Sequence, residues 1–144
     1  MIDFKDNLGR HIALSARHLA RLVARRLEEF GIGAGQYPYI FSLYIKDGQS
    51  QQSLAKNLAV DKAAAARAIG KLVSSGHLKR VQDKNDTRCF RVHLTPKSIK
   101  IRGTLEKTVA SILDEMQKGL TKEERETANN IMKKIMANLQ EKEG

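Results

Sequence analysis

A chain of 144 residues with 5% aromatic residues and no tryptophan must build its core from aliphatic side chains, which favours packed helices. No apolar run is long enough for a membrane span or a secretion signal, and a single cysteine, Cys89, excludes an internal disulfide and fits a reducing cytoplasm. A formal net charge of +10 and a pI of about 9.9 indicate a polyanionic partner such as nucleic acid.

The positive charge is concentrated in one segment. Residues 61–102 carry eleven cations against three acids, a net charge of +8, whereas residues 103–144 carry seven cations against eight acids, a net charge of −1. A uniformly solvated basic surface would not need this asymmetry. Segment 61–102 is therefore expected to meet the polyanion.

Two helices are predicted in the N-terminal part. Apolar residues recur at spacings of three, four and seven over residues 3–29, which is typical of an amphipathic helix. Glycines 31, 33 and 35 end it in a short flexible stretch. A second helix is predicted over residues 36–46, with Pro38 in the first turn, where a missing N–H costs little.

Two further short helices follow, joined by a tight turn. Ser50 is a suitable cap for a helix over 51–58, and Asp61 for a helix over 62–75 that ends before Gly76. A short helix followed across a turn by a basic helix is the pattern of a helix-turn-helix.

A β-hairpin is predicted directly after the basic helix. Strands are expected over 78–82 and 88–94, with the polar turn Asp83-Lys84-Asn85-Asp86 between them. A hairpin at this place forms the wing of a winged helix.

The C-terminal part predicts two long helices. Thr95 and Pro96 suit the start of the fifth helix, Gly119 its end, and Thr121 with Glu124 forms a capping box for the sixth. Both helices carry apolar stripes that one small winged-helix core cannot cover.

The order of motifs resembles the core pattern of the MarR family of transcriptional regulators. The sequence is SQQSLAKNLAVDK over 50–62, RAIGKL over 67–72, GHLKR over 76–80, Asp83 followed by DTR over 86–88, and VHLTPK over 92–97. The match covers roughly residues 31–100. No single motif is decisive, and their joint spacing makes the resemblance specific.

The resemblance implies an α+β, mostly α fold and a homodimer. A winged helix-turn-helix core over 31–97 would lie between an N-terminal dimerisation helix over 1–30 and C-terminal dimerisation helices over 98–144, together one continuous domain over 1–144. Two departures stand out. Alanines occupy positions 63–66, where polar residues are common in the family, and Ser98 stands where a glycine is usual.

The resemblance places Arg67 against DNA, where a guanidinium can bind guanine through two donors. The alternative is that Arg67 contacts only a phosphate or the wing. Arg88 matches the family's wing arginine, a minor-groove probe that Asp86 would orient; the alternative is that this pair only staples the hairpin. Alanines could contact thymine methyl groups. The predicted DNA-contacting residues are Ser50, Lys62, Ala64, Ala65, Arg67, Lys71, Lys84, Asn85, Asp86 and Arg88.

A ligand cleft beside the dimerisation helices is also implied, often used in the family for small aromatic carboxylates. Arg17 could receive the carboxylate, and His18, Tyr37 and Tyr39 could line the cleft. The alternative is that these four are ordinary interface residues.

Catalysis and metal binding have little support in the sequence. The four histidines, at positions 11, 18, 77 and 93, lack the spacing of a metal motif, and Cys89 with His93 supplies only two ligands. We therefore expect no enzyme and no cofactor. We expect a cytoplasmic repressor that binds a pseudo-palindromic double-stranded operator and is released by a small aromatic anion, with no membrane partner. The alternative is an architectural protein that binds DNA with low specificity.

Overall fold

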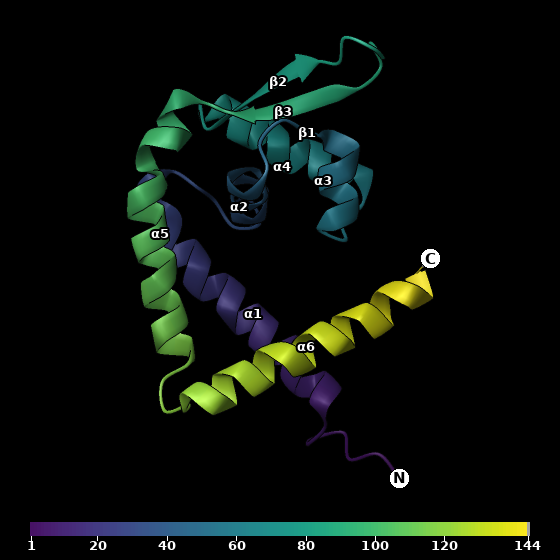
Figure 1. Ribbon diagram of the computed structural model, residues 1–144, viewed down its shortest axis with the longest axis vertical. Helices are drawn as coiled ribbons and strands as arrows, with labels where there is room; N and C mark the ends of the chain where they lie inside the picture. The colour runs from purple at the N-terminus through teal and green to yellow at the C-terminus, as the bar shows by residue number, and fades with distance from the viewer. Residues whose placement is uncertain (144) are drawn as a thin grey trace. The chain divides into compact units, whose positions relative to one another are not determined.

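The computed structural model describes residues 1–143, with side chains described as far as residue 140. Residues Met1–Ala110 form one compact unit and the chain from Ser111 onward forms a second. This division falls within a helix, and the predicted functional boundaries at residues 30 and 97 stay predictions. The first unit contains α1 (Leu8–Leu27), the 3-10 helix η1 (Glu28–Phe30), α2 (Tyr37–Ile45), β1 (Gln49–Ser50), α3 (Gln51–Asn57), α4 (Lys62–Ser74), β2 (Leu78–Gln82) and β3 (Phe90–Leu94). The fifth helix, α5 (Pro96–Met116), enters the second unit, where α6 (Lys122–Glu143) follows (Figure 1).

Helix α1 begins five residues later than its apolar pattern predicts, at Leu8 instead of Asp3. The Asp3 carboxylate accepts from the backbone N–H groups of Lys5 and Asp6, which holds these residues in a turn. Asn7 then caps the helix, because its side-chain oxygen accepts from Arg10 N at 2.9 Å. Polar side chains at the N-terminus compete with the helix for backbone donors, and so the helix starts at the second cap.

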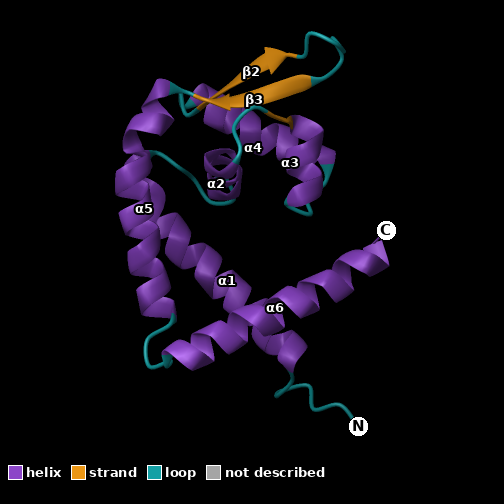
Figure 2. Cartoon of the chain, in the orientation of Figure 1, coloured by secondary structure: helices purple, strands orange, loops and turns teal. Residues whose placement is uncertain are grey.

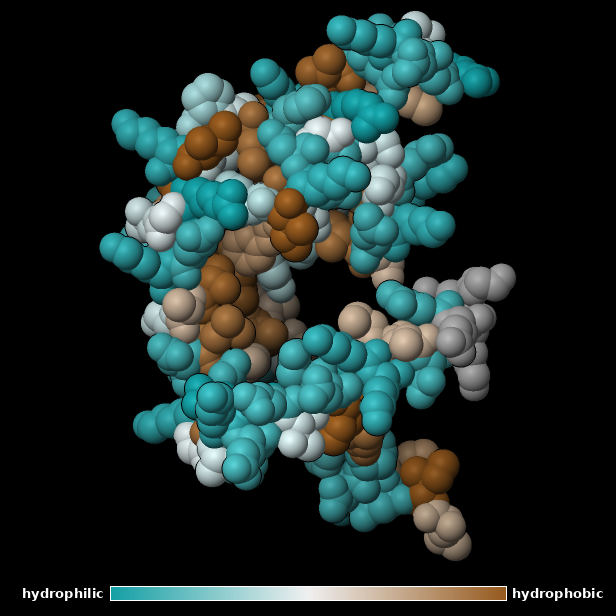
Figure 3. Space-filling model, viewed as in Figure 1, coloured by the Kyte–Doolittle hydropathy of each residue, from teal (hydrophilic) through white to brown (hydrophobic). Residues whose placement is uncertain are grey.

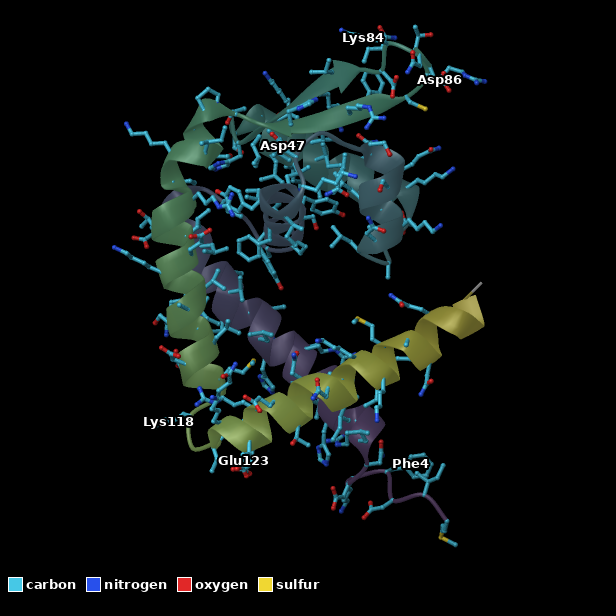
Figure 4. The ribbon with its side chains drawn as sticks, in the orientation of Figure 1. Phe4, Asp47, Lys84, Asp86, Lys118 and Glu123 are labelled. Atoms are coloured by element: carbon cyan, nitrogen blue, oxygen red, sulfur yellow. The ribbon has the colours of Figure 1, made fainter. Side chains whose placement is uncertain are left out.

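The sheet has three antiparallel strands in the order β1-β3-β2 (Figure 2). Leu78 pairs with Leu94, Arg80 with Val92 and Gln82 with Phe90. The short strand β1 was not predicted. Asp47, just before it, anchors this edge because its carboxylate accepts from Leu94 N at 2.9 Å (Figure 4).

The predicted start of the second wing strand at residue 88 is wrong, because β3 begins at Phe90. Cys89 N donates to Asp86 O at 3.0 Å, and Asp83 N donates to Cys89 O at 2.9 Å. Residues 86–89 therefore form a local turn rather than a ladder. Arg88 is consequently displayed from a turn and not from a strand.

The core of the first unit lies where α2, α3 and α4 pack beneath the sheet (Figure 1). Its largest side chains are aliphatic, as the composition predicts, and each contributes roughly 1.5–3 kcal/mol through burial. The fully buried members include Leu27, Ile40, Leu43, Leu54, Ile69, Leu72, Leu78 and Val92.

A buried polar joint connects η1, α2 and the start of α5 to the base of the wing. His77 is 0% exposed, and its Nε2 lies 2.9 Å from Phe30 O. Ser98, also fully buried, donates its hydroxyl hydrogen to His77 O at 2.5 Å, and the Tyr44 hydroxyl donates to Ser98 O at 2.6 Å. Ser98, which departs from the usual glycine, is thus an integral member of the joint.

The second unit is a helical end of α5, a turn and α6. Gly119 in the turn has φ 84°, a left-handed value that favours glycine. The predicted capping box is confirmed, since Thr121 N donates to the Glu124 carboxylate at 3.0 Å and Glu124 N donates to the Thr121 hydroxyl at 3.1 Å. Within the described residues, no helix is long and apolar enough to cross a bilayer.

Candidate nucleic-acid interface

Helix α4 presents one basic face to solvent. Asp61 caps it by accepting from Ala64 N at 2.7 Å, as the sequence predicts. Its buried face consists of Ala65, Ile69 and Leu72, and its opposite face exposes Arg67 and Lys71, one turn apart. A helix with such a face fits the major groove, where each base pair shows a distinct pattern of donors and acceptors.

The alanines before Arg67 differ in accessibility. Ala65 is 0% exposed, so the prediction that it contacts DNA is wrong: its methyl group packs in the core. Ala64 is half-buried, and Ala63 is the exposed member of the run. The helical period of 3.6 residues explains this, because Ala65 lies one turn before Ile69 on the buried side.

The wing tip displays Arg88 under the control of Asp86. The Asp86 carboxylate accepts from Arg88 Nε at 3.2 Å and from Arg88 N at 3.1 Å, and these bonds hold the pKa of Asp86 below its ordinary value. The Arg88 side chain is nevertheless 89% exposed. The geometry agrees with both alternatives raised from the sequence: the Asp86–Arg88 pair could only stabilise the hairpin, or Asp86 could orient Arg88 toward the DNA minor groove. Lys84 and Asp86 lie at the end of the hairpin (Figure 4), and the surface there is mostly hydrophilic (Figure 3).

A second ion pair braces the base of the turn. Arg91 Nε donates to the Asp83 carboxylate at 3.1 Å, and Arg91 Nη1 donates to Gly48 O at 3.0 Å. A backbone bond from Asn85, followed by Arg91, lowers the pKa of Asp83. Lys84 and Asn85, both predicted to contact DNA, are exposed between these braces.

Ser50 and Lys62 lie at the starts of the two helices of the helix-turn-helix. The Ser50 hydroxyl caps α3 by accepting from Ser53 N at 3.0 Å, which leaves its hydrogen as a donor. Lys62 is the exposed first residue of α4.

Arg80 is a residue that the site prediction omitted, although it stands in the GHLKR motif. Its Nε donates to the Gln51 side-chain oxygen at 3.1 Å, and its Nη2 donates to Ala66 O at 2.9 Å. Arg80 therefore links the wing to α3 and α4 at once. The register of the hairpin explains this role, because Arg80 pairs with the buried Val92 and so points to the helical side of the sheet.

Two hollows adjoin these elements. A cavity of about 110 Å³ lies between α3, Lys62 and the wing residues Arg88–Phe90. An open groove of about 970 Å³ runs along the other side of α4, past Arg67, Lys71 and Arg80, to the glycine loop after η1.

The four predicted ligand-cleft residues line neither hollow. Arg17 and His18 are exposed on α1, and Tyr37 is half-buried with its ring centroid 5.5 Å from that of Phe41. Tyr39 is 3% exposed, and burial, followed by the charge of Asp61, raises the pKa of its hydroxyl. Tyr39 is therefore a core residue here, and Arg17, His18 and Tyr37 stay predictions.

The thiol of Cys89 lies 3.5 Å from the Asp86 carboxylate, and burial, followed by this contact, raises its pKa. A raised pKa disfavours the reactive thiolate. In the part of the chain that the structure describes, no three His, Cys, Asp or Glu side chains gather as metal ligands would.

Comparisons with known proteins agree with this architecture. The MarR family model matches residues 32–90. The chain is 30% identical over 130 residues to the multiple antibiotic resistance protein MarR of Salmonella typhimurium, covering 90% of each protein. It is 28% identical over 135 residues to the uncharacterized HTH-type transcriptional regulator YybA of Bacillus subtilis, covering 94% of this chain and 90% of that protein.

Solved structures show the same fold. A MarR transcriptional regulator from Methanosarcina mazei superposes with a TM-score of 0.85 at 32% identity, covering 92% of this chain and 96% of that one. A MarR family regulator from Listeria monocytogenes, solved with a 26mer DNA, superposes with a TM-score of 0.88 at 23% identity, covering 95% and 91%. The chain thus belongs to the MarR family of winged-helix, DNA-binding transcriptional regulators.

Proposed function

We propose that this protein is a homodimeric repressor that binds a pseudo-palindromic operator and is released by a small aromatic anion. One observation carries the proposal: the exposed arginines of α4 and of the wing, Arg67 and Arg88, project from a single compact unit. An arginine on a helix in the major groove and another on a wing at the neighbouring minor groove can together read a site. The proposed location is the cytoplasm.

Sequence preference is the first test. DNA fragments bound by the full-length protein would be selected from genomic DNA, and affinity for the selected site would be compared with affinity for a shuffled duplex at one salt concentration. A repressor is expected to prefer its site by roughly a thousandfold or more. A ratio close to one would contradict the proposal.

A ratio close to one would instead support the second candidate, an architectural DNA-binding protein. The observation that favours it is the alanine run before Arg67, which leaves α4 with few side chains that can hydrogen bond to bases. Affinity would then come almost wholly from phosphate contacts.

A matched pair of variants separates base reading from phosphate binding. Arg67→Ala should weaken binding to the selected site by about 1–3 kcal/mol and affect the shuffled duplex less. Lys71→Ala, one turn away on the same face, should weaken both duplexes alike and lower the salt slope by about one. If Arg67→Ala weakens binding to both duplexes by the same factor, Arg67 contacts a phosphate and does not read a base.

Release by an anion is tested with salicylate at fixed ionic strength. The exposed Arg17 is the proposed carboxylate partner, and Arg17→Ala should reduce the response to salicylate while leaving DNA affinity intact. Arg21→Ala, also exposed on α1, is the control. Linkage requires operator DNA to weaken salicylate binding by the same factor. Unchanged operator affinity across a panel of aromatic carboxylates would contradict this part of the proposal.

A further inference from the structure

A small cavity opens where three parts of the DNA-facing surface meet: the start of α3, the start of α4 and the wing. Its volume is about 110 Å³, and its lining includes Gln51, Gln52, Lys62, Arg88 and Phe90. We propose that one backbone phosphate of bound duplex DNA occupies this cavity. The inference rests on the proposed DNA-binding function and deepens it by assigning a single contact to a single site.

The position of the cavity follows the path of a DNA strand. When α4 lies in the major groove and the wing reaches the adjacent minor groove, the sugar-phosphate strand between those grooves must pass between α4 and the wing. Lys62 begins α4 and Arg88 belongs to the wing, and the cavity lies between them.

The lining has the chemistry of an anion site. It includes two cationic residues, Lys62 and Arg88, and no carboxylate. Among the described residues, no contact engages the Lys62 ammonium, whereas Asp86 engages Arg88. Lys62 is therefore the cation that is free to pair with a phosphate.

Arg80 orients the side-chain amide of Gln51, which is a second hydrogen-bond donor in the cavity. Because a guanidinium can only donate, its 3.1 Å bond identifies the side-chain oxygen of Gln51 as the partner. The amide nitrogen of Gln51 then keeps both hydrogens for another acceptor, and phosphate oxygens only accept. Arg80 is itself anchored on Ala66 O, so Gln51 is held relative to α4. Arg80 is a positioning residue for this contact.

Phe90 gives the cavity an apolar wall. It pairs with Gln82 on the same sheet face as Val92, and it is 42% exposed although it is a large aromatic residue. An apolar wall excludes water from one side of the phosphate, and a charge pair is stronger where the surroundings are less polar. Lys62 should therefore contribute more to DNA affinity than a lysine on an open surface.

The first experiment compares Lys62→Met with Lys79→Met. Both are exposed lysines of the first unit, but Lys79 pairs with His93 on the opposite face of the sheet. Affinity for a mixed-sequence duplex would be measured between low and moderate salt. Affinity falls as salt rises, and Lys62→Met should make this fall shallower: the magnitude of the slope of log affinity against log salt should decrease by about 0.9 for each bound subunit. Lys79→Met should leave the slope unchanged. Equal slopes for the two variants would overturn the proposal.

The second experiment locates the phosphate. Single methylphosphonate linkages, which remove one backbone charge, would be scanned along the selected site. One linkage in each half-site should weaken binding of the wild-type protein and have no further effect on Lys62→Met. If every linkage weakens both proteins by the same factor, the proposal is wrong. If no preferred site exists, the proposed repressor function fails, and the mixed-sequence salt slopes still decide whether Lys62 binds a phosphate.

Discussion

The two compact units of this protein are stabilised in different ways. The first buries a set of large aliphatic side chains that includes Leu27, Leu54 and Leu72. In α6, by contrast, every side chain through residue 140 is exposed except Ile135, which is half-buried. The exposed apolar residues of the second unit include Leu113, Met116, Leu120, Ile131, Met132, Met136 and Leu139.

This comparison separates what a helix can do alone from what needs a partner. An isolated helix is marginally stable in water, and most helical stability in proteins comes from packing an apolar face. The first unit packs α2, α3 and α4 against its own sheet. The apolar residues of α6 support the proposal that a second copy of the chain covers them.

The largest expected difference between the units is in the response to truncated side chains. Leu72→Ala should lower the free energy of unfolding by about 2–5 kcal/mol, because Leu72 is 0% exposed and its removal leaves a cavity. Ile131→Ala should change the unfolding free energy of a single chain by less than about 0.5 kcal/mol, since Ile131 is 47% exposed there, and a larger loss in the assembled protein would come from the proposed contact with a second copy. Urea denaturation followed by circular dichroism at constant protein concentration would test both. Equal losses of unfolding free energy in the two variants would mean that Ile131 is packed as closely within its own chain as Leu72 is.

The pH dependence of unfolding should also differ between the units. Burial, followed by the charge of Lys97, lowers the pKa of His77 from its ordinary value of 6.5, although the bond to Phe30 opposes this. A lowered histidine pKa means that the unfolded chain binds more protons, so stability falls as the pH falls below 6.5 until the folded-state pKa is passed.

The corresponding window in the second unit is lower. The bonds from Thr121 lower the pKa of Glu124 from 4.5, so stability from this cap is present above 4.5 and is lost as the pH falls through the folded-state value. Free energies of unfolding from pH 7.5 to 3 would be compared with those of His77→Gln and Glu124→Gln. His77→Gln should remove the slope just below pH 6.5, and a slope that persists would contradict the prediction. An NMR titration of His77 in the folded protein measures the pKa even where the variant folds poorly.

Helix caps offer a smaller and more even comparison. Asp61→Ala removes the cap of α4, and Thr121→Ala removes the cap of α6. Each should cost about 0.5–2 kcal/mol of helix stability. Hydrogen exchange would show where each loss falls: Asp61→Ala should speed exchange in α4 and its neighbours, and Thr121→Ala should speed it in α6. Faster exchange throughout the chain in Thr121→Ala would show that the units unfold together.

The smallest expected effects come from two glycines. Gly103→Ala places a methyl group in α5 where no atom other than those of its chain neighbours and the adjoining helix backbone lies within 4 Å, and it should stabilise the first unit by about 0.5–1 kcal/mol. Gly119→Ala also meets no neighbour, but φ is 84° there, so the substitution should destabilise the turn by about 1–2 kcal/mol. Thermal unfolding of both variants would test the opposite signs. Stabilisation by Gly119→Ala would mean that the turn relaxes.

Much of the fold could be predicted because its signals are local. The caps Ser50 and Asp61, the capping box of α6 and the left-handed Gly76 all depend on residues within three or four positions of one another. The limits of β2 were predicted correctly for the same reason. The two-residue β1 was missed, because so short a strand exists only through its pairing with β3.

The candidate site was predicted less completely. Arg67, Lys71 and Arg88 are exposed where the motifs place them, but whether they touch DNA stays a prediction. The prediction that Ala65 contacts DNA was wrong because α4 is rich in alanine, and its apolar pattern therefore does not show clearly which side of the helix is buried. Arg80 was omitted because its partners, Gln51 and Ala66, lie 29 and 14 residues away in the chain.

The sequence by itself determined the order of the elements, their caps, the location of the positive charge and the family resemblance, because each depends on residue types at short spacing. Tertiary structure alone decided which alanine is buried, that Gln51 is held by Arg80, and that Ser98 joins His77 in a buried joint. These contacts join residues far apart in the chain, and their partners become neighbours only when burial of the apolar core brings the helices and the sheet together.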